Sequence, residues 1–177
     1  MIRAEGCLSV VYMISLLDKR YMKTFIKIFL LLTLLPFGLY GQTFQVKVIG
    51  ISDGDTFTGL NSDNLQLKFR IHGIDAPEKK QAYGTKAREH LGSLIFKQNV
   101  TVDVNDQDRW GRYIARVATE DGRDVGNEMI QAGLAWHYKH FDKSEAYAQA
   151  EQTARDNKRG LWSDPKAVAP WEFRHKK

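Results

Sequence analysis

Cysteine is nearly absent from this chain of 177 residues, where it occurs only as Cys7. A disulfide within one chain and a zinc site built on thiolates are therefore excluded. The five histidines show no zinc-ligand spacing, and the sequence contains no G-x-x-x-x-G-K-[ST] phosphate loop and no G-x-S-x-G nucleophile motif. These absences exclude several common hydrolase classes that depend on such groups.

A strong charge of one sign is also missing. The net charge is +5, but residues 1–41 carry five Lys and Arg against two Asp and Glu, which leaves 21 basic and 19 acidic residues in the rest of the chain. A domain with that balance does not attract nucleic acid through its overall field. Any contact with phosphate is therefore expected at a local site.

No apolar run at the front reaches the roughly 20 residues that a transmembrane helix needs. Ile28–Leu39 is a shorter run that follows Lys23 and Lys27, which is the form of a secretory signal peptide. We assign residues 22–41 to this signal peptide and expect a secreted, periplasmic or cell-envelope protein, with an uncleaved membrane anchor as the alternative. We interpret residues 1–21 as a start-site extension that the native precursor lacks.

The rest of the chain predicts a mainly β domain. Apolar and polar residues alternate with a period of two, or β-branched residues cluster between turns, in five segments. These predicted strands are 44–48, 56–58, 65–71, 100–104 and 113–119.

Three helices are expected among these strands. Apolar residues recur at helical spacing across 85–97, Asp124 is a good N-cap for a helix to about Ala132, and Ser144 is a good N-cap for a helix that Gly160 ends.

Five short strands with helices after the third and fifth predict an α+β fold, a five-stranded Greek-key barrel of the OB type with about three helices. The domain is expected over 42–162, followed by a basic C-terminal tail over 163–177. Such barrels commonly bind oligonucleotides, but a fold alone does not give a function.

Two short motifs carry carboxylates that suit a hard cation. Asp53-Gly-Asp55 reads as a hairpin turn or as a source of metal ligands, because carboxylate oxygens bind Ca²⁺ or Mg²⁺. Asp75-Ala-Pro-Glu78 reads as a helix capping box, or as a second metal carboxylate followed by a general base for water.

Two arginines lie close to these motifs in the sequence. Arg70 projects from a predicted strand that leads to Asp75, and Arg112 follows Trp110-Gly111 at the start of another strand. A guanidinium binds phosphate oxygens in a bidentate way and stabilises charge that develops in the transition state. The alternative for each arginine is a solvated surface position.

Three aromatic residues add a second way to bind nucleic acid, by stacking on its bases. Trp110, Trp136 and Tyr138 are candidates for stacking on a nucleobase, although aromatic residues in small barrels commonly belong to the core.

The motifs together resemble the staphylococcal nuclease (thermonuclease) family. The similar segments are SDGDTF, FRIHGIDAPE, QAYGTKAREHL, DRWGRYIARV, NEMIQAGLAWHY and NKRGLWSD, in that order, from about Phe44 to Trp162. The resemblance implies an OB-fold barrel with three helices and Ca²⁺-dependent cleavage of DNA and RNA that leaves 3′-phosphate ends.

The resemblance also implies roles for individual residues. Asp55 and Asp75 match the calcium carboxylates, and Asp53 matches a carboxylate near the metal. Arg70 and Arg112 match the arginines that bind phosphate and stabilise the transition state, Glu78 matches the general base, and Tyr138 matches a tyrosine of the nucleotide pocket.

Two departures from the family pattern stand out. Ala76 replaces a threonine, a change that metal binding tolerates if this position offers the metal only its backbone carbonyl. Arg109-Trp110 replaces a Lys-Tyr pair that contacts a terminal phosphate. We expect substrate binding by Arg109 and Trp110 with an altered preference for ends, and retained cleavage.

Four interpretations follow. The first is a calcium-dependent nuclease acting on DNA and RNA as a monomer, with no protein partner indicated. The second is an inactive OB-fold module that only binds nucleic acid, and the third is a cell-envelope interaction domain with a structural calcium. The fourth is an intracellular nuclease with a spurious apolar front.

Overall fold

The structure is a computed structural model and describes residues 42–175. The expected start-site extension, the signal peptide and Cys7 lie outside the described residues. Within the described part of the chain, no helix is both long and apolar enough to cross a membrane.

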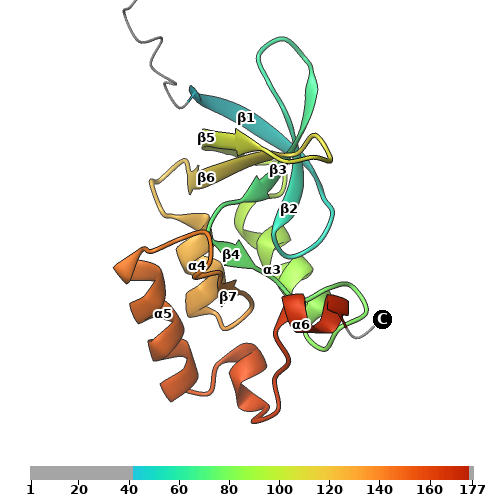
Figure 1. The fold of residues 1–177 in the computed structure, drawn as a ribbon. Coiled ribbons are helices and arrows are strands. Elements are labelled where there is room, and N and C mark those ends of the chain that lie inside the picture. Colours follow the sequence, from blue (N-terminus) through green and yellow to red (C-terminus); the bar gives the residue numbers. More distant parts are fainter. Residues whose placement is uncertain (1–41, 176–177) are drawn as a thin grey trace, which may run out of the picture. The chain divides into compact units, whose positions relative to one another are not determined.

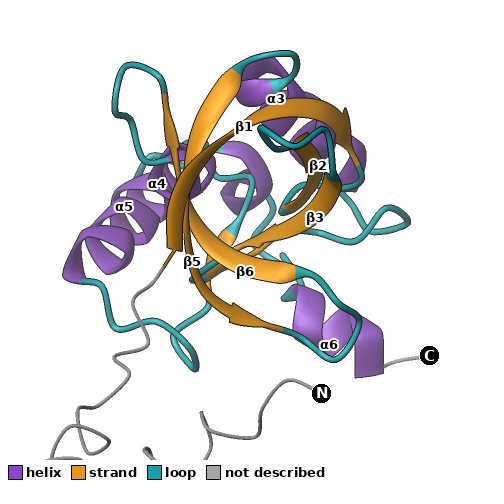
Figure 2. Cartoon of the chain, turned by 90° about the horizontal axis from the view of Figure 1, so that it is seen from above, coloured by secondary structure: helices purple, strands orange, loops and turns teal. Residues whose placement is uncertain are grey.

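Five strands close into a barrel in the order β1-β2-β3-β6-β5 (Figure 2). Neighbouring strands pair antiparallel, except that β3 and β6 pair parallel. The predicted α+β fold with a five-stranded OB-type barrel is therefore confirmed. The strands are β1 (Gln42–Ile51), β2 (Thr56–Leu60), β3 (Gln66–Ile71), β5 (Asn99–Gln107) and β6 (Tyr113–Thr119).

The barrel interior is filled by the apolar residues of the alternating pattern. Val46 and Val48 on β1 are buried, whereas Gln45 and Lys47, which alternate with them, are exposed. Because side chains on a strand alternate between its two faces, this pattern fixes the register of β1.

Helices lie below one end of the barrel in the view of Figure 1. The first, α3 (Gly84–Ile95), buries Ala87, Leu91 and Ile95. Asp124 accepts a hydrogen bond from the Asn127 N–H and starts α4 (Val125–Gln131), as predicted. Side-chain acceptors at such N-caps each stabilise a helix by about 1 kcal/mol.

Ser144 likewise accepts from the Tyr147 N–H and starts α5 (Glu145–Asp156). The predicted end at Gly160 is wrong, because α5 stops at Asp156 and Lys158 already has a left-handed φ of 52°. Gly160 instead begins a 3₁₀ turn, η1 (Gly160–Ser163). A Cβ there would lie 2.2 Å from the Gly133 carbonyl oxygen, so glycine is required by close packing.

The described residues contain four α-helices, one more than expected. The fourth, α6 (Pro170–His175), lies inside the segment that we predicted as a basic tail. Its first residue is a proline, which suits the first turn of a helix because that N–H needs no intrahelical partner. Two further strands of two residues, β4 (Ile74–Asp75) and β7 (Trp136–His137), pair outside the barrel.

The capping-box interpretation of Asp75–Glu78 is wrong. Asp75 belongs to β4, and the residues that follow it are irregular; α3 begins only at Gly84. The carboxylates of this motif are therefore not used to cap a helix, which leaves them available for another purpose.

Candidate active site

Two buried carboxylates and one arginine meet at the ends of three strands. Asp55 directly precedes β2, Arg70 lies on β3 and Asp75 lies on β4. The Arg70 Nη2 lies 3.1 Å from Asp55 Oδ2 and 2.7 Å from Asp75 Oδ1. The structure thus brings together residues that are up to 20 positions apart in the sequence.

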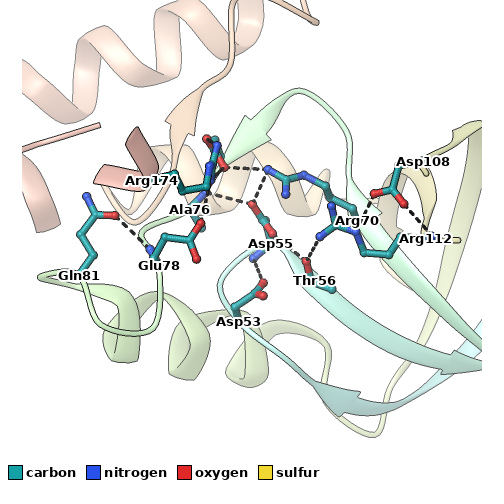
Figure 3. Close-up of polar contacts among 11 residues, drawn as sticks. Asp53, Asp55, Thr56, Arg70, Ala76, Glu78, Gln81, Asp108, Arg112 and Arg174 are labelled. Atoms are coloured by element: carbon teal, nitrogen blue, oxygen red, sulfur yellow. Dashed lines mark hydrogen bonds and ion pairs between the residues drawn. The ribbon is translucent and has the colours of Figure 1, made fainter. Parts of the chain in front are cut away.

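The turn between β1 and β2 presents the first carboxylates. The Asp55 N–H donates to Asp53 Oδ1 at 3.2 Å, so the aspartate pair forms both a turn and part of the site (Figure 3). Gly54 allows this turn to lie flat on its neighbours, since a Cβ there would come within 2.7 Å of the Cβ atoms of Ala76 and Ala87.

The loop from β4 to α3 contributes the next residues. The Ala76 N–H donates to Asp55 Oδ2 at 3.2 Å, and the Glu78 N–H donates to Gln81 Oε1 at 3.1 Å. These bonds hold the loop against the aspartate turn. Glu78 itself is partly exposed and lies beside the buried carboxylates in Figure 3.

Burial and nearby carboxylates raise the pKa values of two aspartates at this site. Burial and the neighbouring Asp55 raise the pKa of Asp53 to about 6. Burial is also the largest influence on Asp75, and together with Asp55 it raises the pKa of Asp75 although Arg70 and Arg174 oppose the change. Burial and a nearby like charge both disfavour the ionised carboxylate, whereas an opposite charge nearby favours it.

Arg112 lies close to the same turn. Its Nε donates to Asp108 Oδ2 at 2.7 Å, and its Nη1 lies 3.5 Å from Thr56 Oγ1. The Thr56 hydroxyl in turn donates to Asp55 Oδ1 at 2.9 Å. These contacts hold the Arg112 guanidinium near the carboxylates, so Arg112 is not a freely solvated surface residue.

The hairpin between β5 and β6 carries the other predicted substrate residues. Trp110 is 66% exposed, so it does not belong to the core. The guanidinium carbons of Arg109 and Arg112 lie 4.3 and 5.2 Å from the Trp110 ring centre. An exposed indole between two guanidiniums presents an aromatic face beside positive charge.

Tyr138 follows β7, and its N–H donates to the Gly73 carbonyl at 2.8 Å. Its ring stacks on Trp171 of α6, with centroids 5.2 Å apart and planes 13° apart. Trp136, the third aromatic candidate, is only partly exposed and packs edge-on against Trp162 and Trp171.

Three residues near the site were missed in the sequence. Thr56 and Asp108 position other side chains, and the DGDT and DRWGR segments that contain them carry the only available signal. Arg174 gave no local signal at all. Its guanidinium donates to both oxygens of Asp75, at 3.2 and 2.7 Å, and to Glu78 Oε1 at 2.8 Å.

The donor set suits a hard cation that also takes water. Within residues 42–175, no three His, Cys, Asp or Glu side chains form a complete metal-ligand group. Asp55 and Asp75 nevertheless supply buried carboxylate oxygens, and the Ala76 carbonyl follows directly. Ca²⁺ accepts six to eight oxygen ligands that include carbonyls and waters, so these residues fit it.

Comparison with known proteins identifies the family. The family model described as staphylococcal nuclease homologue matches residues 68–164. An uncharacterized endonuclease of Escherichia coli O157:H7 is 39% identical over 131 residues, which cover 74% of this chain and 85% of that protein.

Two further relatives agree with this result. The micrococcal nuclease of Shigella flexneri is 37% identical over 142 residues, with 74% of this chain and 80% of that protein covered. An uncharacterized endonuclease of Haemophilus influenzae is 38% identical over 128 residues, with 72% and 71% covered. The resemblance expected from the motifs is confirmed: the chain belongs to the staphylococcal nuclease family and is an endonuclease.

Proposed function

We propose that this protein is a Ca²⁺-dependent nuclease that hydrolyses DNA and RNA to leave 3′-phosphate ends. The observation that carries the proposal is the sharing of Arg70 between two buried carboxylates, Asp55 and Asp75. The arginine supplies a group that binds phosphate, and the carboxylates supply ligands for a hard cation. Both would act on the phosphate group, which DNA and RNA share.

In the proposed reaction, water attacks phosphorus and the bond from phosphorus to O5′ breaks. Glu78 accepts a proton from the attacking water and later releases it to solvent, the leaving O5′ takes up a proton from solvent, and the 3′-oxygen keeps the phosphate. Bound Ca²⁺ would supply neutralisation of the phosphate and polarisation of its oxygens. Asp55, Asp75 and the Ala76 carbonyl would hold the ion.

Arg70 and Arg112 bind non-bridging phosphate oxygens in this proposal. Arg70 comes from β3 and Arg112 immediately precedes β6, and these strands lie side by side in the barrel. Two planar guanidiniums held by aspartates are pre-organised, so they stabilise charge in the transition state without reorganisation. Arg109, Trp110 and Tyr138 would contact neighbouring parts of the strand.

The test is digestion of single-stranded DNA and of RNA by the purified protein with Ca²⁺, with Mg²⁺ and with a chelator. We expect cutting only with Ca²⁺. The products should resist extension by a polymerase until a phosphatase removes the 3′-phosphate. A Glu78→Ala variant prepared in the same way controls for a contaminating nuclease and should lose the activity.

Other results would point elsewhere. A folded protein that binds DNA but cuts with no metal would be the inactive OB-fold module. A protein whose melting temperature depends on Ca²⁺, but which neither binds nor cuts nucleic acid, would be the interaction domain with a structural ion. Products that a polymerase extends directly would contradict the proposed position of bond cleavage.

We also propose that the protein is exported. The support is the signal-peptide form of residues 22–41, which lie outside the described part of the chain. Sequencing of the mature N-terminus after expression from the full gene should find a start near Gln42 in the secreted, periplasmic or cell-envelope fraction. A cytoplasmic protein that retains residues 22–41 would contradict export.

A further inference from the structure

The C-terminal strap, which we define as residues 168–175, lies across the candidate active site. In Figure 1, α6 lies beside the loop that leads from β4 to α3. The strap has two side chains that reach the site, Arg174 and Trp171, and each of them contacts a residue to which the proposed function assigns a role.

The positively charged guanidinium of Arg174 contacts the carboxylates of the site, as a bound metal cation would. Its guanidinium makes one bond to Glu78 and two to Asp75, and both of its Nη atoms take part. Asp75 is a proposed metal ligand, so its oxygens are not free for an ion while this contact lasts. Glu78 is the proposed base, and its Oε1 accepts a hydrogen bond from Arg174 instead of facing a water molecule.

Trp171 covers the aromatic side of the same site. Its ring lies nearly parallel to that of Tyr138, at a planar angle of 13° and a centroid distance of 5.2 Å. Such stacking is the arrangement that a nucleobase adopts on an aromatic side chain. One face of Tyr138 is therefore already used by the protein itself.

The start of the strap is anchored, and its end is partly exposed. The Gln81 Nε2 donates to the Val168 carbonyl at 2.6 Å, and Ala169 and Pro170 are buried. Val168 and Phe173 line a cavity together with residues outside the strap. The Arg174 side chain is 39% exposed, although the Asp75 side chain that it contacts is only 1% exposed.

A helix as short as α6 has little stability of its own. Isolated helices below about 12 residues are marginal in water, and α6 has six residues. Once its contacts with Asp75 and Tyr138 are lost, the helix gains little by staying formed. Opening of the strap therefore requires loss of the Arg174 bonds to Asp75 and Glu78 and of the Trp171 packing on Tyr138 and Trp136, but little helical stability is lost with them.

We propose that the C-terminal strap is an autoinhibitory element that competes with the divalent cation and the substrate for the active site. This inference rests on the proposed function, since it takes Asp75 as a metal ligand and Tyr138 as a base-stacking residue. In the closed form, Arg174 holds Asp75 and Glu78, and Trp171 holds Tyr138. Cation and nucleic acid bind to the open form.

The first test is calorimetric titration of the full protein and its variants with Ca²⁺ alone. If the closed form dominates, weakening the strap should lower the apparent Kd for Ca²⁺ by about tenfold, because only the open fraction binds. We expect this for Arg174→Ala. An Arg159→Ala variant changes the net charge equally and should leave the Kd unchanged, because the Arg159 guanidinium donates to the Gln131 carbonyl on α4 and not to a residue of the site.

Trp171→Ala separates competition from simple charge removal. This variant keeps Arg174 and every other charge but removes the stack on Tyr138. The strap model expects tighter Ca²⁺ binding here too, whereas a purely electrostatic effect of Arg174 leaves Trp171→Ala at the wild-type Kd. A wild-type Kd in Trp171→Ala overturns the proposal, and it does so even if Arg174→Ala binds more tightly.

Hydrogen exchange provides a second measurement that does not depend on cutting. Amides in residues 168–175 should be protected in chelator and should exchange faster when Ca²⁺ is added. Unchanged or increased protection would overturn the strap. Slower turnover of Arg174→Ala at saturating Ca²⁺ would also overturn it and make Arg174 a catalytic residue.

The two proposals fail in different ways. If the wild-type protein cuts with Ca²⁺ while the Kd stays the same in both strap variants, the strap is wrong and the nuclease mechanism stands. If the wild-type protein and both strap variants fail to cut with Ca²⁺, the proposed function is wrong. If no variant binds Ca²⁺, competition for the ion is refuted as well.

Discussion

Two buried aspartates of this protein, Asp75 and Asp142, have similar partners and opposite electrostatics. Asp75 is 0% exposed and accepts a 2.7 Å bond from Arg70, and Asp142 is 4% exposed and accepts a 2.7 Å bond from Arg116. Yet the pKa of Asp75 is raised, whereas that of Asp142 is lowered.

Burial and neighbouring groups together set the pKa of each carboxyl group. Although burial by itself raises the pKa of Asp142, the Ser144 N–H, Arg116 and His137 together lower it, and no second carboxylate is among its main influences. For Asp75 burial is the largest influence on the pKa, the nearby Asp55 adds to it, and the contacts with Arg70 and Arg174 do not offset the two. The neighbours of Asp142 thus favour its ionised form, whereas Asp75 lies beside a second carboxylate even though two arginines contact it.

The largest expected difference between the two regions is in activity. Arg70→Lys should lower turnover on single-stranded DNA by about 10²- to 10³-fold, because an ammonium loses the planar two-point contact with phosphate. Arg116→Lys, the matched change at Asp142, should stay within about twofold. An Arg70→Lys/Arg112→Lys double variant that cuts at the wild-type rate would remove arginine binding of phosphate from the mechanism.

Loss of stability should show the reverse order, with the larger loss at Asp142 and the smaller loss at the candidate active site. Asp142→Asn removes the charge that Arg116 and His137 share, and we expect the free energy of unfolding in urea to fall by about 3 kcal/mol. Asp55→Asn relieves crowding and should cost less than about 1 kcal/mol. Asp121→Asn, at an exposed pair with Arg123, controls for the loss of one surface charge and should melt like wild type. Equal losses at Asp142 and Asp55 would contradict the distinction.

The pH dependence sharpens the same contrast. Because the folded pKa of Asp142 lies below the ordinary value of 3.8, its contribution to stability is present above about pH 4 and is lost as the pH falls through the folded pKa. The gap in unfolding free energy between wild type and Asp142→Asn should therefore narrow below about pH 4. A gap that widens in acid would show that the sign is wrong.

The smallest expected effect is stabilisation by the ion. At a Ca²⁺ concentration ten times the Kd, binding to the folded protein should raise its unfolding free energy by about 1.4 kcal/mol. Asp55→Asn should lose this gain, whereas Asp142→Asn, although less stable, should keep it. Melting curves with Ca²⁺ and with chelator measure both variants.

Local patterns were sufficient for most of the fold. Alternation in β1 and β3 and the N-caps Asp124 and Ser144 are short-range features, so the sequence predicted them correctly. The end of α5 was misplaced because we expected Gly160 to end the helix, whereas α5 stops at Asp156 and Lys158 already has a left-handed φ of 52°. Gly160 instead packs closely against Gly133, a tertiary contact that the local rule for a glycine at a helix end does not include.

The site was predictable only where its residues belong to motifs. Asp55, Arg70, Asp75 and Glu78 were identified by motif, and the structure brings them together. Arg174 lies 96 residues from Glu78 and 99 from Asp75, and its helix is too short to show a period. No pattern within a local window reports a contact of that range.

The parallel pairing of β3 with β6 has a consequence for folding kinetics. It aligns Arg70 with Ile114, two residues beyond Arg112, across more than forty positions of chain. Pairings over such separations form late, because the entropy of closing the intervening loop is lost before the contact stabilises anything. After dilution from urea, helical circular dichroism should therefore recover before nuclease activity does, and the delay between the two signals should measure the time that barrel closure takes.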